Sequence, residues 1–327
     1  MIVNKGILKA YSRMGQKGAS SGIGMVELGK ERPNIRAVVA DSVAIASLDR
    51  FNNLHPNRIV NVGIAEQNMI SVAAGMASES EDCVFAFTYA AFITARALEQ
   101  VRLNLGYHKF NVKIVGNSAG FAMEMLGVSH WAVEDIAYIR AIPNITILSP
   151  ADSLEAINAI KAAAEIQGPV YVRLSGGANV PIVYENDYDF QVGKAITLRD
   201  GTDTAIIATG MMVNESLKAA ALLEERGISC KVVNVHTIKP LDTNILDDIF
   251  KSYNYIFSIE EHSKIGGLSS AIAEYKADKV NSPALISIGV DDTYRKLGTQ
   301  EYIWQQYGLT AEQICNKIYK QIKKVIL

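Results

Sequence analysis

A glutamate at the start of a helix of small residues is the first feature of this sequence that could do chemistry. Glu66 stands in the segment 61–75, NVGIAEQNMISVAAG, where an apolar strand ends and a helical pattern begins. In open parallel sheets, ligands bind at the carboxyl ends of the strands. A carboxyl group held there among apolar side chains can hold or share a proton. The alternative is that Glu66 only stabilises the positive end of the helix.

Two aromatic side chains follow in the segment TYAAFITARALEQ. Tyr89 and Phe92 are three residues apart, and this spacing by itself is typical of a helix face that packs into a core. Arg96 and Glu99 come next on the same segment. Their spacing allows an ion pair one helical turn apart, and we interpret both as structural.

A histidine in GVSHWAVEDIAYIR is the third candidate. The imidazole of His130 can change its charge near pH 7 and can donate or accept a hydrogen bond. The alternative is a histidine satisfied by Glu134, one turn later. His262, in EEHSKIGGLSS, is interpreted as structural or subunit-contacting.

An α/β framework must position these residues. Short β-branched segments alternate with longer segments that have apolar residues at helical spacing. In the first half, the predicted strands are 35–40, 58–62, 83–87, 112–116, 146–149 and 170–174, and the predicted helices are 22–30, 66–78, 91–105, 134–140 and 153–165. Ser153 is expected to cap the last helix. The alternation indicates a mostly parallel sheet that is covered on both faces.

A second α/β unit follows an irregular stretch, ANVPIVYENDYDFQVGK. We therefore predict a first domain over 1–180, a linker over 181–194 and a second domain over 195–327. The predicted strands of the second domain are 204–209, 229–235, 255–259 and 284–289, and its helices are 214–226, 245–252, 268–276 and a terminal helix from 311.

Composition narrows the class of protein. The 327 residues include 32 basic and 34 acidic ones, and this balance carries no electrostatic signal for nucleic acid. Three widely spaced cysteines fit neither a disulfide framework nor a metal site. The apolar segments are too short for a membrane span, and the N-terminus lacks the pattern of a signal peptide. We expect a cytoplasmic protein without a membrane segment.

Seven segments in this order resemble the C-terminal half of transketolase: VELGKERPNIRAVVAD, RIVNVGIAEQNM, AAFITARALEQVR, NVKIVGNSAG, GVSHWAVEDIAYIRAIPNITILSPAD, GPVYVRLS and SIEEHSKIGGLSSAIAE. The likeness is strongest to the separate smaller subunit of two-gene, or split, transketolases, and it covers nearly the whole chain. It implies a pyrimidine-binding domain followed by a transketolase C-terminal domain.

The resemblance also implies a cofactor, thiamine diphosphate, and a role for each candidate residue. Glu66 falls on the catalytic glutamate that hydrogen-bonds a ring nitrogen of the aminopyrimidine and activates the cofactor. Tyr89 and Phe92 fall on the aromatic positions that stack on the pyrimidine ring, and Asp41 falls on an aspartate near the cofactor. His130 falls on the histidine that hydrogen-bonds the substrate.

One half of the cofactor site has no counterpart in the sequence. Transketolases bind Mg²⁺ and the diphosphate through a GDG motif and a later asparagine, and this chain contains no GDG. We therefore expect the metal ligands on a partner chain, an N-terminal diphosphate-binding subunit, in an α₂β₂ assembly. The isolated chain is expected to be inactive.

The phosphate-binding residues of the family are also altered. Lys17 or a gap replaces an early arginine, Ser118 replaces a histidine, and Gly176 replaces an arginine. Because guanidinium groups are the usual grip for phosphate, their loss predicts a different acceptor, such as an unphosphorylated, nucleotide-linked or carrier-linked aldehyde. Arg13, Lys17 or Arg173 could take over the role.

The resemblance thus predicts the small subunit of an enzyme that transfers a two-carbon ketol unit from a ketose to an aldehyde. Two alternatives stay open. The first is the beta subunit of a 2-oxo acid dehydrogenase-type decarboxylase, although AEQNM favours transketolase. The second is a non-catalytic scaffold, which the presence of Glu66, His130 and the aromatic pair argues against.

Overall fold

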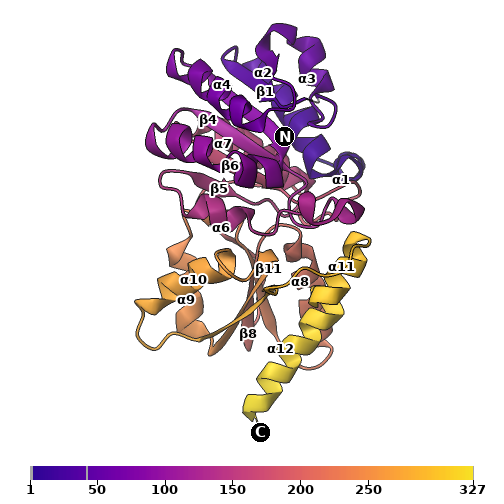
Figure 1. Ribbon diagram of the computed structural model, residues 1–327. Coiled ribbons are helices and arrows are strands. Elements are labelled where there is room, and N and C mark those ends of the chain that lie inside the picture. Colours follow the sequence, from indigo (N-terminus) through magenta and orange to yellow (C-terminus); the bar gives the residue numbers. More distant parts are fainter. Residues whose placement is uncertain (1–2, 42, 327) are drawn as a thin grey trace.

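The computed structural model describes residues 3–41 and 43–326 and shows two α/β units, one above the other in Figure 1. The sheet of the upper unit has seven strands, in the order β10 (Thr237–Lys239), β5 (Thr146–Leu148), β6 (Val170–Leu174), β4 (Val112–Asn117), β3 (Cys83–Tyr89), β1 (Ile35–Val39) and β2 (Ile59–Asn61). The sheet of the lower unit has five, in the order β12 (Ala284–Val290), β11 (Tyr255–Ser263), β8 (Thr204–Ala208), β9 (Cys230–Asn234) and β7 (Ile196–Arg199).

Neighbouring strands are parallel in both sheets except at one edge of each. Strand β10 runs antiparallel to β5, and β7 runs antiparallel to β9. The prediction of two α/β domains with mostly parallel sheets is therefore confirmed.

Helices connect the strands and cover the sheets. The α-helices are α1 (Lys5–Ala19), α2 (Met25–Glu31), α3 (Asp49–Leu54), α4 (Glu66–Ser78), α5 (Leu98–Gln100), α6 (Asp135–Arg140), α7 (Ser153–Glu165), α8 (Met212–Glu224), α9 (Thr243–Ser252), α10 (Leu268–Ala277), α11 (Gln300–Tyr307) and α12 (Ala311–Ile326). Shorter helical segments are η1 (Ser20–Gly24), η2 (Pro56–Arg58), η3 (Phe92–Arg96), η4 (Val101–Tyr107) and η5 (Glu124–Ser129). None of the helices in the described ranges has both the length and the apolar character of a membrane span.

Both faces of the upper sheet are buried, which explains why its strands are nearly continuous apolar runs. Val38 of β1 packs with Ile70 of α4 on one face. The next residue back, Ala37, points to the other face and packs with Leu28 of α2 and Ile160 of α7. This alternation along the strand fixes which helices lie on which side of the sheet.

The lower unit contributes one strand to the upper sheet. In β10, Thr237 pairs with Leu148 of β5, and the Nζ of Lys239 donates to the carbonyl of Arg140 at 3.0 Å. Neither β10 nor β7 was predicted, because three or four residues carry too little periodic pattern to identify a strand. The two sheets therefore do not divide the chain at a single point.

The N-terminal helix was also not predicted. Helix α1 continues through η1 into α2, and it bends at Gly15, where φ is +71°. A side chain at Gly15 would collide with the carbonyl oxygen of Gly177, so the bend brings α1 against the segment that follows β6. The buried amide of Gln16 completes this contact, since it donates to the carbonyl of Pro150 at 2.7 Å and accepts from the N–H of Gly176 at 2.9 Å.

The irregular segment between β6 and β7 is held against α7. One carboxylate oxygen of Asp152 accepts from the N–H groups of Val183 and Tyr184, at 2.8 and 3.0 Å. Its other oxygen accepts from the N–H of Glu155, so Asp152 caps α7 and the prediction that Ser153 does so is wrong. The same side chain thus caps the helix and anchors the segment that leads to the lower unit.

Candidate functional site

Glu66 lies at the turn from β2 into α4. The chain leaves the end of β2 through Gly63, where φ is +75°, and Glu66 is the first residue of the helix. Its side chain is 6% exposed, although it carries a charge. A buried carboxylate requires a compensating partner, and the sequence indicated none.

That partner is Arg96. Its Nη1 lies 2.8 Å from Oε1 of Glu66, and its guanidinium carbon lies 4.1 Å from the centre of the Phe92 ring. The pair predicted between Arg96 and Glu99 is not formed in the described structure, because Glu99 accepts from the side-chain amide of Gln100 instead. The interpretation of Arg96 as merely structural overlooked its contact with the candidate catalytic carboxylate.

The two aromatic candidates and the histidine meet in one cluster. The ring of Tyr89 lies 5.5 Å from that of Phe92 and 5.5 Å from that of His130, and the Phe92 and His130 rings are 5.1 Å apart. All three contacts are edge-to-face, an arrangement that leaves ring faces free for another planar group. Glu134 does not satisfy His130: it accepts from the hydroxyl of Tyr294, while Nδ1 of His130 lies 3.0 Å from Oγ of Ser129.

A cavity of about 100 Å³ opens between these elements. Its lining includes four of the predicted site residues, Asp41, Glu66, Tyr89 and Phe92. The remaining lining residues are mainly apolar or backbone-exposing: Ala40, Ile45, Ala46, Ile64, Phe87, Thr88 and Asn117. The structure therefore brings together at one cavity residues that are up to 51 positions apart in the chain, from Asp41 to Phe92.

Asn117 is a member of this cavity that the sequence did not single out. Its side chain is fully buried, yet neither its Oδ1 nor its Nδ2 has a hydrogen-bond partner among the described residues. An unsatisfied buried amide costs about 1–3 kcal/mol, so such groups are usually satisfied by a ligand or water. The available signal was its position as the last residue of β4, at the carboxyl end of a parallel strand.

Asp41 is held at the end of β1 in the left-handed region, with φ of +74°. Its N–H donates to Oδ1 of Asn61 at 3.2 Å, and the Nδ2 of Asn61 donates back to the carbonyl of Asp41. This exchange ties the ends of β1 and β2 together and leaves the carboxylate of Asp41 exposed at the mouth of the cavity.

The three residues expected to grip substrate lie in different surroundings. Ser118 is half-buried beside Asn117, with φ of +56°. Lys17 is half-buried next to the contact between Gln16 and Gly176, and burial lowers its pKa. Arg173, in contrast, is 1% exposed and lies in the interior, so its guanidinium does not reach the cavity and the expectation that it binds substrate needs correction.

The residues around His262 form the junction between the two units. Arg173 pairs with Asp135 at 2.8 Å, and its Nη2 donates to the carbonyl of Glu261 at 3.0 Å. His262 is fully buried, and burial lowers its pKa to about 4, so the ring is neutral near pH 7. Its Nε2 accepts from the N–H of Ala137 at 3.4 Å, which fits the structural interpretation of this histidine.

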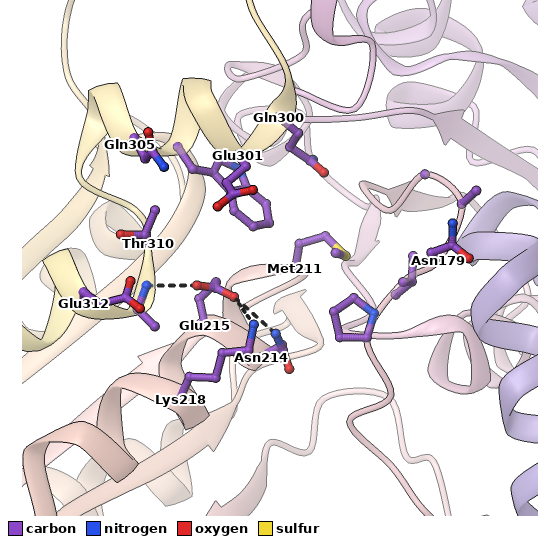
Figure 2. A pocket seen from close by; sticks show the side chains of 16 residues that line it. Asn179, Met211, Asn214, Glu215, Lys218, Gln300, Glu301, Gln305, Thr310 and Glu312 are labelled. Carbon is purple, nitrogen blue, oxygen red and sulfur yellow. Dashed lines mark hydrogen bonds and ion pairs between the residues drawn. The ribbon is translucent and has the colours of Figure 1, made fainter. Parts of the chain in front are cut away.

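A larger cavity lies elsewhere, in the lower unit. Figure 2 shows this space of about 430 Å³ between α8, α11, the start of α12 and the segment around Asn179. The carboxylate of Glu215 accepts there from Lys218 at 2.8 Å and from the N–H of Ala311 at 2.9 Å. No predicted site residue lines it, and its polar groups are already paired, so the smaller cavity at Glu66 is the better candidate.

Family models match both units of the chain. Residues 18–179 match the pyrimidine-binding domain of transketolase, and residues 193–314 match the transketolase C-terminal domain. A putative transketolase C-terminal section from Methanocaldococcus jannaschii is 40% identical over 94% of this chain and 97% of its own length. One of the two subunits of an apulose-4-phosphate transketolase from Phocaeicola vulgatus is 37% identical over 92% of this chain and 95% of its own length. A 6-deoxy-6-sulfo-D-fructose transketolase subunit from a Clostridium species is 39% identical over 89% of each chain.

A solved structure described as a split-gene transketolase, an inactive beta4 tetramer, has the same fold. It superimposes with a TM-score of 0.85 at 38% identity, and the match covers 93% of this chain and 97% of that one. A transketolase from Campylobacter jejuni shares the fold at a TM-score of 0.75 and 18% identity, over 95% of this chain and 48% of that one.

Proposed function

Because the chain belongs to the transketolase family and matches subunits of its split members along nearly its whole length, we propose that it is the small subunit of a thiamine diphosphate-dependent enzyme that transfers a two-carbon ketol unit from a ketose to an aldehyde. The observation that carries this proposal is the cavity where the Glu66 carboxylate meets the Tyr89 and Phe92 rings.

The cavity fits one planar heterocycle. A pocket of about 150 Å³ holds a benzene ring in an engineered protein, so about 100 Å³ is of the order needed for a single ring at a site that opens outward. The aromatic edges of Tyr89 and Phe92 suit stacking, and Glu66 offers a hydrogen-bond acceptor. The unsatisfied amide of Asn117 supplies a further donor and acceptor to a polar occupant. These features support the aminopyrimidine of thiamine diphosphate as the occupant.

When bound, thiamine diphosphate supplies the electron sink for breaking and forming the carbon–carbon bond. The part of this chain is to bind and orient the pyrimidine and to handle one proton. Glu66 accepts a hydrogen bond from the ring, and its burial at the start of α4 fixes where that bond points. His130 lies against both aromatic rings, so its imidazole stands where it can meet a substrate hydroxyl or carbonyl.

The remaining half of the site is proposed to come from a partner. The sequence lacks the GDG motif for Mg²⁺ and the diphosphate, and we assign those ligands to an N-terminal diphosphate-binding subunit in an α₂β₂ assembly. The beta4 tetramer of the split-gene relative is described as inactive, which supports a need for a second kind of subunit.

The acceptor is proposed to be an aldehyde without a free phosphate ester. The arginine of the family pattern is Gly176 here, and the interior position of Arg173 removes one of the three cations that could replace it. Arg13 and Lys17 remain, and burial already disfavours the charged form of Lys17 by lowering its pKa. Fewer available cations weaken the attraction for a phosphate dianion.

The test is reconstitution of the chain with the diphosphate-binding subunit that co-purifies with it, and comparison of wild type with Glu66→Gln. Glutamine keeps the size of the side chain but cannot take up or give a proton, so we expect turnover to fall by about 10²–10⁴-fold. Glu312→Gln, on the exposed start of α12, is the matched control and should retain wild-type turnover. Full activity of Glu66→Gln would refute the proposed function and favour a scaffold.

A further inference from the structure

We propose that Arg96 is a positioning residue that holds the Glu66 carboxylate and the Phe92 ring in place from the side facing away from the cofactor cavity. This inference rests on the proposed function, because it concerns the residues that would bind the pyrimidine. Neither the sequence pattern nor the family match assigns Arg96 a role.

The first support is the hydrogen-bonded ion pair with Glu66. The Arg96 side chain is 49% exposed and that of Glu66 is 6% exposed, so the partner that keeps the buried carboxylate in place reaches in from the surface. Because Nη1 binds Oε1 at 2.8 Å, one oxygen of the carboxylate is fixed and the rotation of the carboxyl group is restricted. A fixed carboxyl group loses less entropy when it binds a ring nitrogen.

The second support is the contact with Phe92. The guanidinium carbon lies 4.1 Å from the ring centre, within the range of a cation–π interaction. Glu66 and Phe92 both line the cavity of about 100 Å³, but Arg96 does not. Arg96 lines an open groove of about 450 Å³ instead, together with Phe92, Val128 and Tyr138. One guanidinium therefore supports the polar and the aromatic contact of the cavity at once, without occupying it.

The third support is the backbone around Arg96. Residues Phe92–Arg96 form a π-helical turn, and turns of this kind occur frequently at functional sites. The turn brings residues 92 and 96 to the same face, and the side-chain amide of Gln67, the neighbour of Glu66, donates to the carbonyl of Arg96 at 3.3 Å. Side chain and backbone of Arg96 are thus both tied to the start of α4.

The chemistry of the contact is specific to arginine. Only a planar guanidinium can lie flat on Phe92 and direct an N–H group at Glu66 from the same position. Lysine keeps the charge but offers a compact ammonium, so Arg96→Lys should preserve the attraction to Glu66 and lose most of the stacking. Arg96→Gln removes the charge altogether.

The experiment uses the complex reconstituted with the diphosphate-binding subunit and four forms of this chain: wild type, Arg96→Gln, Arg96→Lys and Arg102→Gln. Arg102 is exposed on the next helical segment and serves as the matched control. Titration calorimetry with thiamine diphosphate and Mg²⁺ gives the cofactor Kd independently of activity. Steady-state kinetics give kcat and the KM of the ketose donor, and thermal melts report stability.

We expect Arg96→Gln to raise the cofactor Kd and to lower kcat by about tenfold each, with the donor KM and the Tm unchanged. Arg96→Lys should restore part of both losses, and Arg102→Gln should match wild type. Cofactor Kd and kcat of Arg96→Gln within twofold of wild type would overturn the inference, as would a parallel loss of Tm that accounts for the change. If Glu66→Gln is inactive in the same series, the proposed function stands even when this inference fails; if Glu66→Gln is active, the proposed function itself fails.

Discussion

Nε of Arg173 lies 2.8 Å from Oδ2 of Asp135, and both side chains are 1% exposed. The hydroxyl of Tyr171 donates to the same carboxylate oxygen at 2.6 Å, and Nη2 of Arg173 reaches the carbonyl oxygens of Ala132 and Glu261. One buried guanidinium therefore joins the end of the upper sheet to strand β11 of the lower one.

Removing this guanidinium should destabilise the fold. Arg173→Met leaves the Asp135 carboxylate buried without its cation, and losses of about 3–5 kcal/mol are usual for such a change. Denaturant unfolding measures the difference, and Arg102→Met on the exposed surface is the control. Arg173→Met combined with Asp135→Leu should recover part of the loss. A loss below about 1 kcal/mol for the single variant would contradict a structural role for the pair.

Glu261 predicts a pH dependence of stability. Burial raises its pKa to about 7, while a glutamate in the unfolded chain has its ordinary value near 4.5. Between these pH values the folded protein keeps a proton that the unfolded chain has released, so the contribution of Glu261 to stability decreases as pH rises from about 4.5 to about 7. His262 opposes this trend, because burial lowers its pKa to about 4 and its unfolded form takes up a proton below about 6.5.

Comparison of wild type with Glu261→Gln isolates the carboxyl group, because His262 is present in both proteins. The glutamine variant should gain stability relative to wild type by up to about 1.4 kcal/mol per pH unit across that window and stay level above it. Unfolding free energies at pH 5, 6, 7 and 8 provide the measurement. A difference that is independent of pH would show that Glu261 titrates at its ordinary value, contrary to its burial.

Asn117 should exchange stability for binding. Asn117→Leu replaces an amide without partners by an apolar side chain of similar size, so the free energy of unfolding should stay the same or rise by about 1–3 kcal/mol. Cofactor affinity of the reconstituted complex should fall about tenfold, because the occupant of the cavity loses a donor and an acceptor. The contrasting variant is Asn111→Leu: its Oδ1 accepts from Lys113 at 2.6 Å, and its loss should destabilise the protein. A destabilised Asn117→Leu with unchanged cofactor affinity would contradict the prediction.

His130 should affect substrate more than cofactor. It contacts both aromatic rings but does not line the cavity, so His130→Ala should lower kcat/KM by about 10²-fold and leave the cofactor Kd within about twofold. His108→Ala, at an exposed position, is the control. Calorimetry and steady-state kinetics on the same complex separate the two effects, and an equal loss in both would place His130 at the cofactor instead.

The acceptor can be identified by paired substrates. With one ketose donor, aldehydes with and without a phosphate ester are compared on the reconstituted enzyme, and we expect the unphosphorylated member to have the higher kcat/KM. Ordinary transketolase rates with ribose 5-phosphate would contradict the altered phosphate grip at Gly176. The names of two relatives, which include a phosphate sugar and a sulfo sugar, make anionic acceptors the natural comparison set.

The strands and helices of the upper sheet could be predicted from the sequence because their residues are buried on both faces. Strand β6 was predicted with its observed bounds, and β1 and β5 to within a residue at one end. A periodic apolar pattern is a local signal, and it survives without knowledge of the tertiary structure. Glu66, Tyr89, Phe92 and His130 could be named for a similar reason, since each lies in a short motif with a recognisable spacing.

Only the tertiary structure decided which side chains meet. Arg96 pairs with Glu66 rather than with Glu99, Arg173 turns into the interior rather than toward substrate, and Asn117 faces the cavity without a partner among the described residues. These outcomes depend on contacts between residues 30 or more positions apart and on the π-helical turn at 92–96, which no local pattern encodes. The sequence determines which elements form because burial selects side chains one element at a time, whereas the pairing of polar groups depends on how those elements pack against one another.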